Sequence, residues 1–141
     1  MSYRYLDDLS RADIAFEAEG TCLDDLFESA WEALLTVMVP DPMSLEAREE
    51  RTLVLEEENV EWLLHGFLER LLYHRDAECL LLRIQQLRAS EIPCRVHATL
   101  VGESVDPRRH ATETDIKAVT WHRFGVSLED GLWRATVVLD V

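Results

Sequence analysis

Four strand-like segments follow one another in the second half of the chain without a helical pattern between them, at residues 80–87, 92–100, 116–127 and 132–141. In 92–100 every second residue is apolar, which is the period of a strand with one buried face. Asp130-Gly131 separates the last two segments and is typical of a tight hairpin turn. Strands joined without crossover helices pair antiparallel, so this half of the chain predicts an antiparallel sheet.

The first half of the chain alternates strands with helices. Residues 11–18 alternate between apolar and polar as a half-buried strand does, and residues from 23 up to Pro40 carry apolar side chains at helical spacing. A short strand is predicted at 51–55, and Asn59 is a cap for a second helix that runs to about residue 75.

The resulting order β-α-β-α-β-β-β-β predicts an α+β fold, a two-layer sandwich in which two helices pack on one face of a mixed or antiparallel sheet. No linker, repeat or low-complexity tract interrupts the sequence, so residues 1–141 are expected to form a single domain. Three tryptophans, Trp31, Trp62 and Trp133, are expected in its core. His65 and His74 are expected at the surface or half-buried.

The chain is strongly acidic, with 28 acidic and 14 basic residues and a net charge of −14. Such a surface repels phosphate backbones, which argues against direct nucleic-acid binding and favours a basic protein partner or cations. Neither a membrane-spanning apolar run nor a secretory signal is evident, and the three cysteines lack the C-x-x-C spacing of a metal or redox motif. A cytoplasmic protein without membrane contact is therefore expected.

The alternation also predicts which side chains share a face of the sheet. In 132–141 the apolar residues at odd positions face the helices, so Asp140 faces away, and in 11–18 Asp13 lies opposite Ile14. Asp13 and Asp140 then share the helix-free face, at matching ends if the two strands are neighbours. The Asp140 side chain and the Val141 α-carboxylate are expected at one fixed spot. Carboxylates this close repel one another unless a cation or a basic partner group lies among them, so Asp13, Asp140 and Val141 form a candidate metal site, with ordinary solvated acids as the alternative.

A second group of polar residues lies in the segment 102–122, a loop that leads into a strand. Its residue types fit an acid–base or metal cluster, and they equally fit a structured turn with an internal salt bridge. The residues considered as supporting or partner-facing groups are Asp106, Arg109, His110, Asp115, Lys117 and His122. No nucleophile elbow, H-x-x-x-H pair or phosphate-binding glycine loop is present, so an enzyme with its own turnover has little support and no catalytic residue is assigned.

Taken together, these segments resemble the archease family. The family's motif G-E-x-x-D-P-x-R-H followed by E-I-K-A-V-T-Y-H is matched here by Gly102-Glu103, Asp106–His110 and Asp115–His122. The family's closing L-D-[IV] is matched by Leu139-Asp140-Val141, and its helical W-L-N-E-L-L-Y is similar to 67–73. One departure lies near the start, where the family's D-H-T-[AS]-D reads Asp8-Leu9-Ser10-Arg11 before Ala12-Asp13, without the histidine.

The resemblance implies an accessory factor of an RtcB-type RNA ligase in tRNA splicing or RNA repair. Archeases promote guanylylation of that ligase with GTP and its multiple turnover, and they are not ligases themselves. Carried over to this sequence, the family's metal site consists of Asp13, Asp140 and Val141, and it holds a divalent ion such as calcium, magnesium or manganese.

Two other functions remain open at this point. A small metal-dependent phosphoester hydrolase would use the same acids with His110 or His122 as the base. A chaperone-like modulator would bind several clients through an apolar surface and would not need Asp13 or Asp140.

Overall fold

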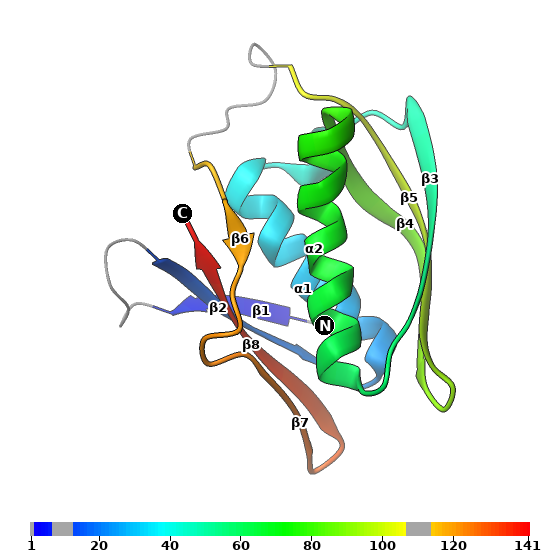
Figure 1. Cartoon of the computed structure of the whole chain (residues 1–141), viewed down its shortest axis with the longest axis vertical. Coiled ribbons are helices and arrows are strands. Elements are labelled where there is room, and N and C mark those ends of the chain that lie inside the picture. Colours follow the sequence, from blue (N-terminus) through cyan, green and yellow to red (C-terminus); the bar gives the residue numbers. More distant parts are fainter. Residues whose placement is uncertain (1, 7–12, 107–113) are drawn as a thin grey trace.

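In the computed structural model, two helices lie between two antiparallel sheets, and each helix contacts both sheets (Figure 1). The structure describes residues 2–6, 13–106 and 114–141. The predicted α+β class, with two helices and antiparallel strand pairing, is confirmed. The strands divide between two sheets, whereas the prediction had one, because alternation shows which face of a strand is buried and not which strands pair.

The first sheet has the strand order β1-β2-β8-β6, and β7 also pairs with β8. Its strands are β1 (Ser2–Leu6), β2 (Asp13–Gly20), β6 (Ala118–Val119), β7 (Gly125–Glu129) and β8 (Leu132–Asp140). The predicted hairpin joins β7 to β8, with Glu129 opposite Leu132. Asp130 and Gly131 have φ values of 52° and 76°, the left-handed pair that a two-residue hairpin turn requires.

The segment predicted as one strand at 116–127 is split into β6 and β7. β6 ends with Val119 opposite Leu139, and β7 begins with Gly125 opposite Thr136. Residues 120–124 therefore lie across from only two residues of β8, 137 and 138. Thr120 still donates its backbone N–H to the carbonyl oxygen of Val138 at 2.9 Å, and residues 121–124 loop out of the sheet.

The second sheet has the order β3-β5-β4, formed by β3 (Glu49–Glu56), β4 (Leu80–Glu91) and β5 (Cys94–Ser104). Ile92 and Pro93 make the turn between β4 and β5, where Glu91 pairs with Cys94. The prediction that Ile92 begins the strand is wrong, and its side chain is 94% exposed. The apolar alternation continues through the turn, so it does not mark the end of the strand.

The helices are α1 (Leu23–Met38) and α2 (Val60–Glu78), and a short 3₁₀ turn, η1 (Pro42–Ser44), follows α1. Asn59 is the predicted cap of α2, and its side-chain oxygen accepts the backbone N–H of Trp62 at 2.9 Å. α1 ends two residues before Pro40, as proline requires. No helix in the described part of the chain combines the length and apolar character needed to cross a bilayer.

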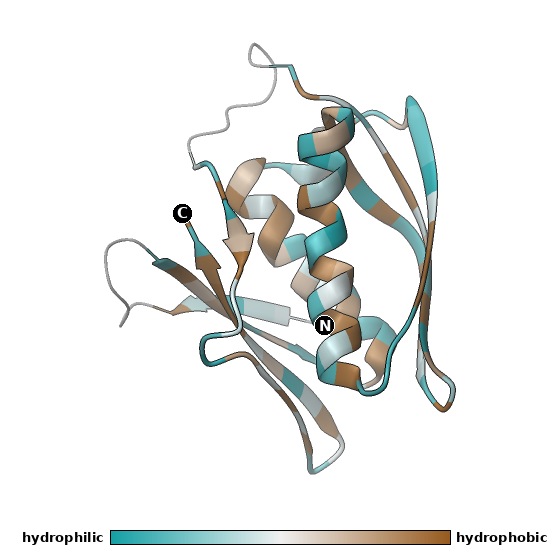
Figure 2. Ribbon diagram, in the orientation of Figure 1, coloured by the Kyte–Doolittle hydropathy of each residue, from teal (hydrophilic) through white to brown (hydrophobic). Residues whose placement is uncertain are grey.

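The core fills the space between the helices and the two sheets. Figure 2 shows hydrophobic and hydrophilic residues alternating along the strands. The buried hydrophobic residues of the strands pack against the buried faces of α1 and α2 in one core. Trp31 is buried as predicted, and its indole N–H donates to the carbonyl oxygen of Leu82 at 2.9 Å, which ties α1 to the second sheet. Trp62 was expected in the core and is 56% exposed.

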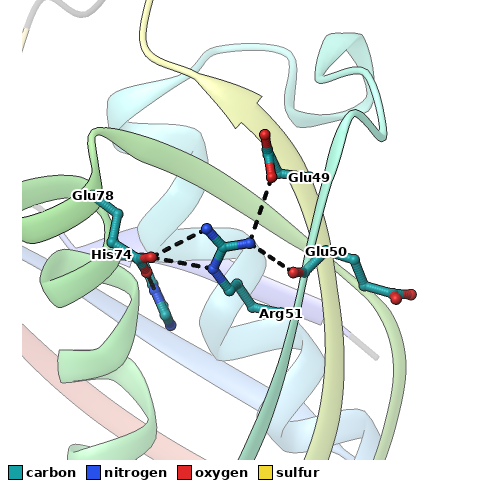
Figure 3. A network of polar contacts seen from close by, with 5 residues as sticks. All are labelled: Glu49, Glu50, Arg51, His74 and Glu78. Carbon is teal, nitrogen blue, oxygen red and sulfur yellow. Dashed lines mark hydrogen bonds and ion pairs between the residues drawn. The ribbon is translucent and has the colours of Figure 1, made fainter.

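A polar network joins the start of β3 to the end of α2 (Figure 3). The Arg51 guanidinium donates to Glu78 from Nε and Nη2 at 3.2 and 3.1 Å, and it lies 3.6 Å from a carboxylate oxygen of Glu49. His74, one helical turn before Glu78, contacts the other carboxylate oxygen of Glu78 through Nδ1. The hydrogen bond with His74 is the largest cause that lowers the pKa of Glu78, followed by the hydrogen bond with Arg51.

This network predicts an acid-sensitive contribution to stability. A carboxyl group whose pKa is lowered by folding stabilises the protein above its ordinary pKa of 4.5, and the contribution is lost as the pH falls through the lowered value. We expect the difference in unfolding free energy between wild type and Glu78→Gln to be positive near neutral pH and to shrink steadily below pH 4.5. Urea unfolding across this range measures it, and Asp76→Asn, with a side chain 63% exposed on the same helix, is the control. A difference that stays constant with pH would show that Glu78 carries no such linkage.

Candidate metal centre

The predicted acids meet at the ends of β2 and β8. The two strands pair antiparallel, and their register places Asp13 directly opposite Asp140. Residues in this relation project their side chains from the same face of a sheet, with Cβ atoms about 4.5–5.5 Å apart. The prediction that Asp13 and Asp140 share one face at matching ends of neighbouring strands is therefore confirmed.

The opposite face of these strands belongs to the core. Ile14 and Leu139, the next pair in the register, pack in or against the hydrophobic core on the side of the helices. Asp13 is half-buried and Asp140 is exposed. Val141 is half-buried, and its side chain packs against the core, which holds the backbone beyond Asp140 in place.

The face of β2 and β8 that carries Asp13 and Asp140 changes in charge along the strands. At the end of the strand pair opposite the two aspartates, the register pairs Glu19 with Arg134, and the Arg134 guanidinium also lies 3.5 Å from Glu17. Such opposite charges across a strand pair are mildly stabilising. At the near end the register pairs the two acids Asp13 and Asp140, which is destabilising unless positive charge lies close by.

Strand β6 borders the other side of Asp140, with Ala118 opposite it in the register. The backbone N–H of Lys117 donates to the carbonyl oxygen of Asp140 at 2.8 Å. Asp140 is thus fixed by backbone pairing on both sides, and Lys117 is the one supporting residue that the described structure brings beside it. Lys117 is exposed and is the only lysine of the chain.

The other supporting residues lie elsewhere or outside the described part of the chain. The Asp115 carboxylate lies 3.7 Å from Nη1 of Arg75 on α2, and His122 is exposed in the looped-out segment after β6. Asp106 follows β5 and lines a surface hollow with Arg48 and Glu103. Arg109 and His110, like the departure at Asp8–Arg11, lie outside the described residues.

The Gly102-Glu103 pair has a structural role that sequence reasoning missed. A Cβ atom on Gly102 would lie 1.8 Å from the backbone oxygen of Leu81, so only glycine allows β4 and β5 to approach here. Glu103 is buried, and its carboxylate accepts the backbone N–H of Glu46 at 2.5 Å. The sequence pattern predicts the end of this strand at residue 100 and Gly102 at the start of a loop, whereas β5 continues to Ser104, so the loop prediction is wrong for residues 102–104. A glycine next to a strand pattern was the available signal for a close approach of two backbones.

The donor set suits a hard divalent cation. Asp13 and Asp140 offer carboxylate oxygens from two adjacent strands, the ligand type that calcium, magnesium and manganese prefer. Among the described residues no three histidine, cysteine, aspartate or glutamate side chains gather as a metal site. A cation bound here would therefore need further oxygen ligands, from the backbone or terminal carboxylate at Val141 or from water.

Comparison with known proteins identifies the family. The model of the archease protein family matches residues 3–141. Protein archease of Thermococcus gammatolerans is 37% identical over 133 residues, covering 92% of this chain and 93% of the relative, and that of Pyrococcus abyssi is 35% identical with the same coverage.

Two solved structures share the fold. The solution structure of protein 1598 from Methanobacterium thermoautotrophicum has a TM-score of 0.81 at 31% identity and covers 99% of this chain and 98% of its own. The crystal structure of an archease, possible chaperone, from Thermotoga maritima has a TM-score of 0.66 at 20% identity, with coverage of 94% and 93%. Because the family model matches nearly the whole of this chain, the chain belongs to the archease family.

Proposed function

We propose that this chain is a metal-binding accessory factor of an RtcB-type RNA ligase, and that it promotes guanylylation of the ligase with GTP and its multiple turnover in tRNA splicing or RNA repair. The proposal joins the family assignment to one feature of this structure. That feature is the register of β2 and β8, which sets Asp13 against Asp140.

The register supports the proposal because it brings two carboxylates, from opposite ends of the sequence, to one place on the sheet. Two carboxylates directly opposite each other across an antiparallel pair repel. A sequence selected only for stability would place a base at one of these positions, as it does at Glu19 and Arg134 on the same face. Two acids at such a position are typical of a site that binds positive charge.

Asp13, Asp140 and the α-carboxylate of Val141 would hold the metal, and the backbone of Lys117 would support Asp140 through its hydrogen bond. A bound divalent ion would supply concentrated positive charge at one edge of an otherwise acidic molecule. The residues of this chain position that charge: β2 and β6 fix Asp140 from both sides, and the core contact of Val141 holds the following backbone.

The acidic surface supports a protein partner over direct contact with RNA. A ligase that binds RNA presents basic side chains, and a chain of net charge −14 is attracted to such a surface and repelled by phosphates. The ligase, and not its nucleic-acid substrate, is therefore the partner that we propose.

Reconstitution tests this function. The purified protein is added to a cognate RtcB-type ligase with GTP, a divalent metal and an RNA bearing the termini that the ligase joins, and guanylylated ligase and joined RNA are followed over time. We expect several rounds of joining per ligase with the protein present, and about one without it. Equal turnover in both reactions would contradict the proposal.

Assays of the same purified protein also distinguish the two alternative functions, a hydrolase and a chaperone-like modulator. Hydrolysis of a phosphoester by the protein alone would favour a hydrolase. Suppression of aggregation of unrelated unfolded proteins, undiminished by changes at Asp13 and Asp140, would favour the chaperone-like activity suggested for the Thermotoga maritima protein.

A further inference from the structure

The segment looped out between β6 and β7 carries a tryptophan onto the surface of α2. Trp121 is 52% exposed, although it contacts three other rings. It stacks on the His65 imidazole with ring centroids 3.8 Å apart and planes 7° from parallel. Phe124 meets Trp121 edge-on at 5.3 Å and His65 at 5.0 Å.

His65 anchors this segment from the helix. It is buried, and its Nε2 lies 3.0 Å from the carbonyl oxygen of Val119 on β6. Its Nδ1 lies 2.9 Å from a carboxylate oxygen of Glu69, one helical turn further along α2. The ring beneath Trp121 is therefore fixed at both nitrogens, and Trp121 is held in position while half of its surface stays in contact with solvent.

Trp62 extends the aromatic surface along α2. Its ring centroid lies 5.6 Å from that of Trp121, and it is 56% exposed. Tyr73, eleven residues further and so on the same side of the helix, is 50% exposed. We call Trp62, Trp121 and Tyr73 the aromatic face. Exposed rings grouped in this way are typical of protein interaction sites, since aromatic residues dominate the binding energy of interfaces.

The exposed charges on α2 around the aromatic face are negative, and Arg123 is an exposed base in the segment that carries Trp121. Between Val60 and Asp76 the exposed residues of α2 besides the two aromatics are Glu61, Glu69 and Asp76. Arg70 is half-buried, and its guanidinium lies 5.5 Å from the centre of the Tyr73 ring, which shows that this surface accommodates an arginine against an aromatic ring. Aromatic rings among carboxylates suit a partner that presents arginine side chains.

We propose that the aromatic face is the surface on which the RNA ligase proposed above docks, through arginine side chains that stack on Trp62 and Trp121. This inference depends on the proposed function for its partner. A second copy of the chain is a poorer occupant, because a twofold contact would bring Glu61 and Glu69 against their own copies. RNA bases can stack on tryptophan, but the carboxylates of α2 repel the phosphates.

Strand β6 connects the aromatic face to the edge of the sheet where Asp140 lies, although the side chains of Asp13 and Asp140 project from the face that points away from the helices. β6 has only two residues, of which Ala118 lies opposite Asp140 and Val119 contacts His65. Trp121 follows two residues later. We therefore assign docking of the ligase to the aromatic face and binding of the metal to the ends of β2 and β8, as separate roles of two surfaces.

The test measures binding and stimulation separately, using the full chain and a cognate RtcB-type ligase. Calorimetry gives the Kd for wild type, Trp62→Ala, Trp121→Ala and Glu61→Lys, and for Met43→Ala as the control, because Met43 is 76% exposed on η1. Truncation of a central interface tryptophan weakens binding by about 30-fold. We expect this loss for both tryptophan variants, a smaller loss for Glu61→Lys, and a Kd within about twofold of wild type for Met43→Ala. Stimulation by Trp62→Ala should return at saturating concentration.

Each other outcome overturns the inference in a distinguishable way. If wild type binds and stimulates the ligase and both tryptophan variants bind equally well, the docking surface is wrong and the proposed function stands. If wild type neither binds nor stimulates the ligase, the docking surface and the proposed function are both wrong. If Trp62→Ala abolishes self-association or binding of a single-stranded RNA oligonucleotide and leaves ligase binding unchanged, the aromatic face serves that occupant instead. Trp62 lies outside the core near the start of α2, and unchanged thermal melting of Trp62→Ala would exclude unfolding as the cause.

Discussion

Replacing Asp140 with asparagine is expected to abolish stimulation of the RNA ligase without unfolding the protein. Loss of an outer-shell partner already weakens a metal site by about 10–100-fold, so loss of a carboxylate ligand should weaken it by about 100-fold or more. The same change removes the repulsion between Asp140 and Asp13, so the metal-free variant should be as stable as wild type or slightly more stable. Calorimetric titration with calcium, magnesium and manganese, together with the turnover assay, measures both effects.

Asp130→Asn is the matched control. Asp130 belongs to the same hairpin as Asp140, at its other end, and the left-handed φ of 52° there suits asparagine as well as aspartate. It removes the same charge from the same sheet, so it should leave metal binding and stimulation unchanged. Asp13→Asn should behave as Asp140→Asn does, and a short extension after Val141 tests the contribution of its α-carboxylate. Full stimulation by both aspartate variants would remove the metal centre from the proposed mechanism.

Replacing Gly102 with alanine is expected to have the largest effect on stability. The added Cβ would lie 1.8 Å from the Leu81 backbone oxygen, and a backbone atom in a paired strand cannot move aside as a flexible side chain can. Gly102 pairs with β3 as well as β4, so relief of the clash would separate strands at the middle of the second sheet. We expect a loss of about 4 kcal/mol or more, in the range of the most damaging point mutations.

Gly66→Ala provides the opposite control within the same chain. Gly66 lies inside α2, where the nearest atom to an added methyl group is Leu55 Cδ1 at an ordinary 3.9 Å. Alanine favours the helix over glycine by about 1 kcal/mol, so this variant should be more stable than wild type. Chemical unfolding of the two variants measures the contrast, and similar stabilities would show that β4 and β5 are not as close as the structure has them.

The juxtaposition of Asp13 and Asp140 was predictable because it depends on a short-range property of strands. The alternation around Asp13 and Asp140 defines the face of each residue, and this assignment does not depend on how the other elements are arranged. The assumption that the two strands are neighbours was needed in addition, and sequence alternation alone does not supply it.

The features that were missed depend on contacts between distant segments. The pattern at 116–127 is continuous in the sequence, but the strand breaks at 120–124, where Trp121 leaves the sheet to stack on His65 of α2. Trp62 lies on the exposed side of α2 for the same reason: its ring meets Trp121 and not the core. His65, predicted at the surface or half-buried, is buried because Val119 and Trp121 cover it. The periodicity of a single segment does not predict such contacts between side chains of distant segments.

The pairing of β2 with β8 has a consequence for how the protein matures. Asp13 and Asp140 are separated by almost the full length of the sequence, so a ribosome completes both helices and the seven other described strands before β8 can join β2. Until then the first carboxylate has no counterpart, and a nascent or truncated chain lacks the site altogether. Under the proposed function, competence to stimulate a partner would thus depend on the pairing of β2 with β8, the last described strand in the sequence.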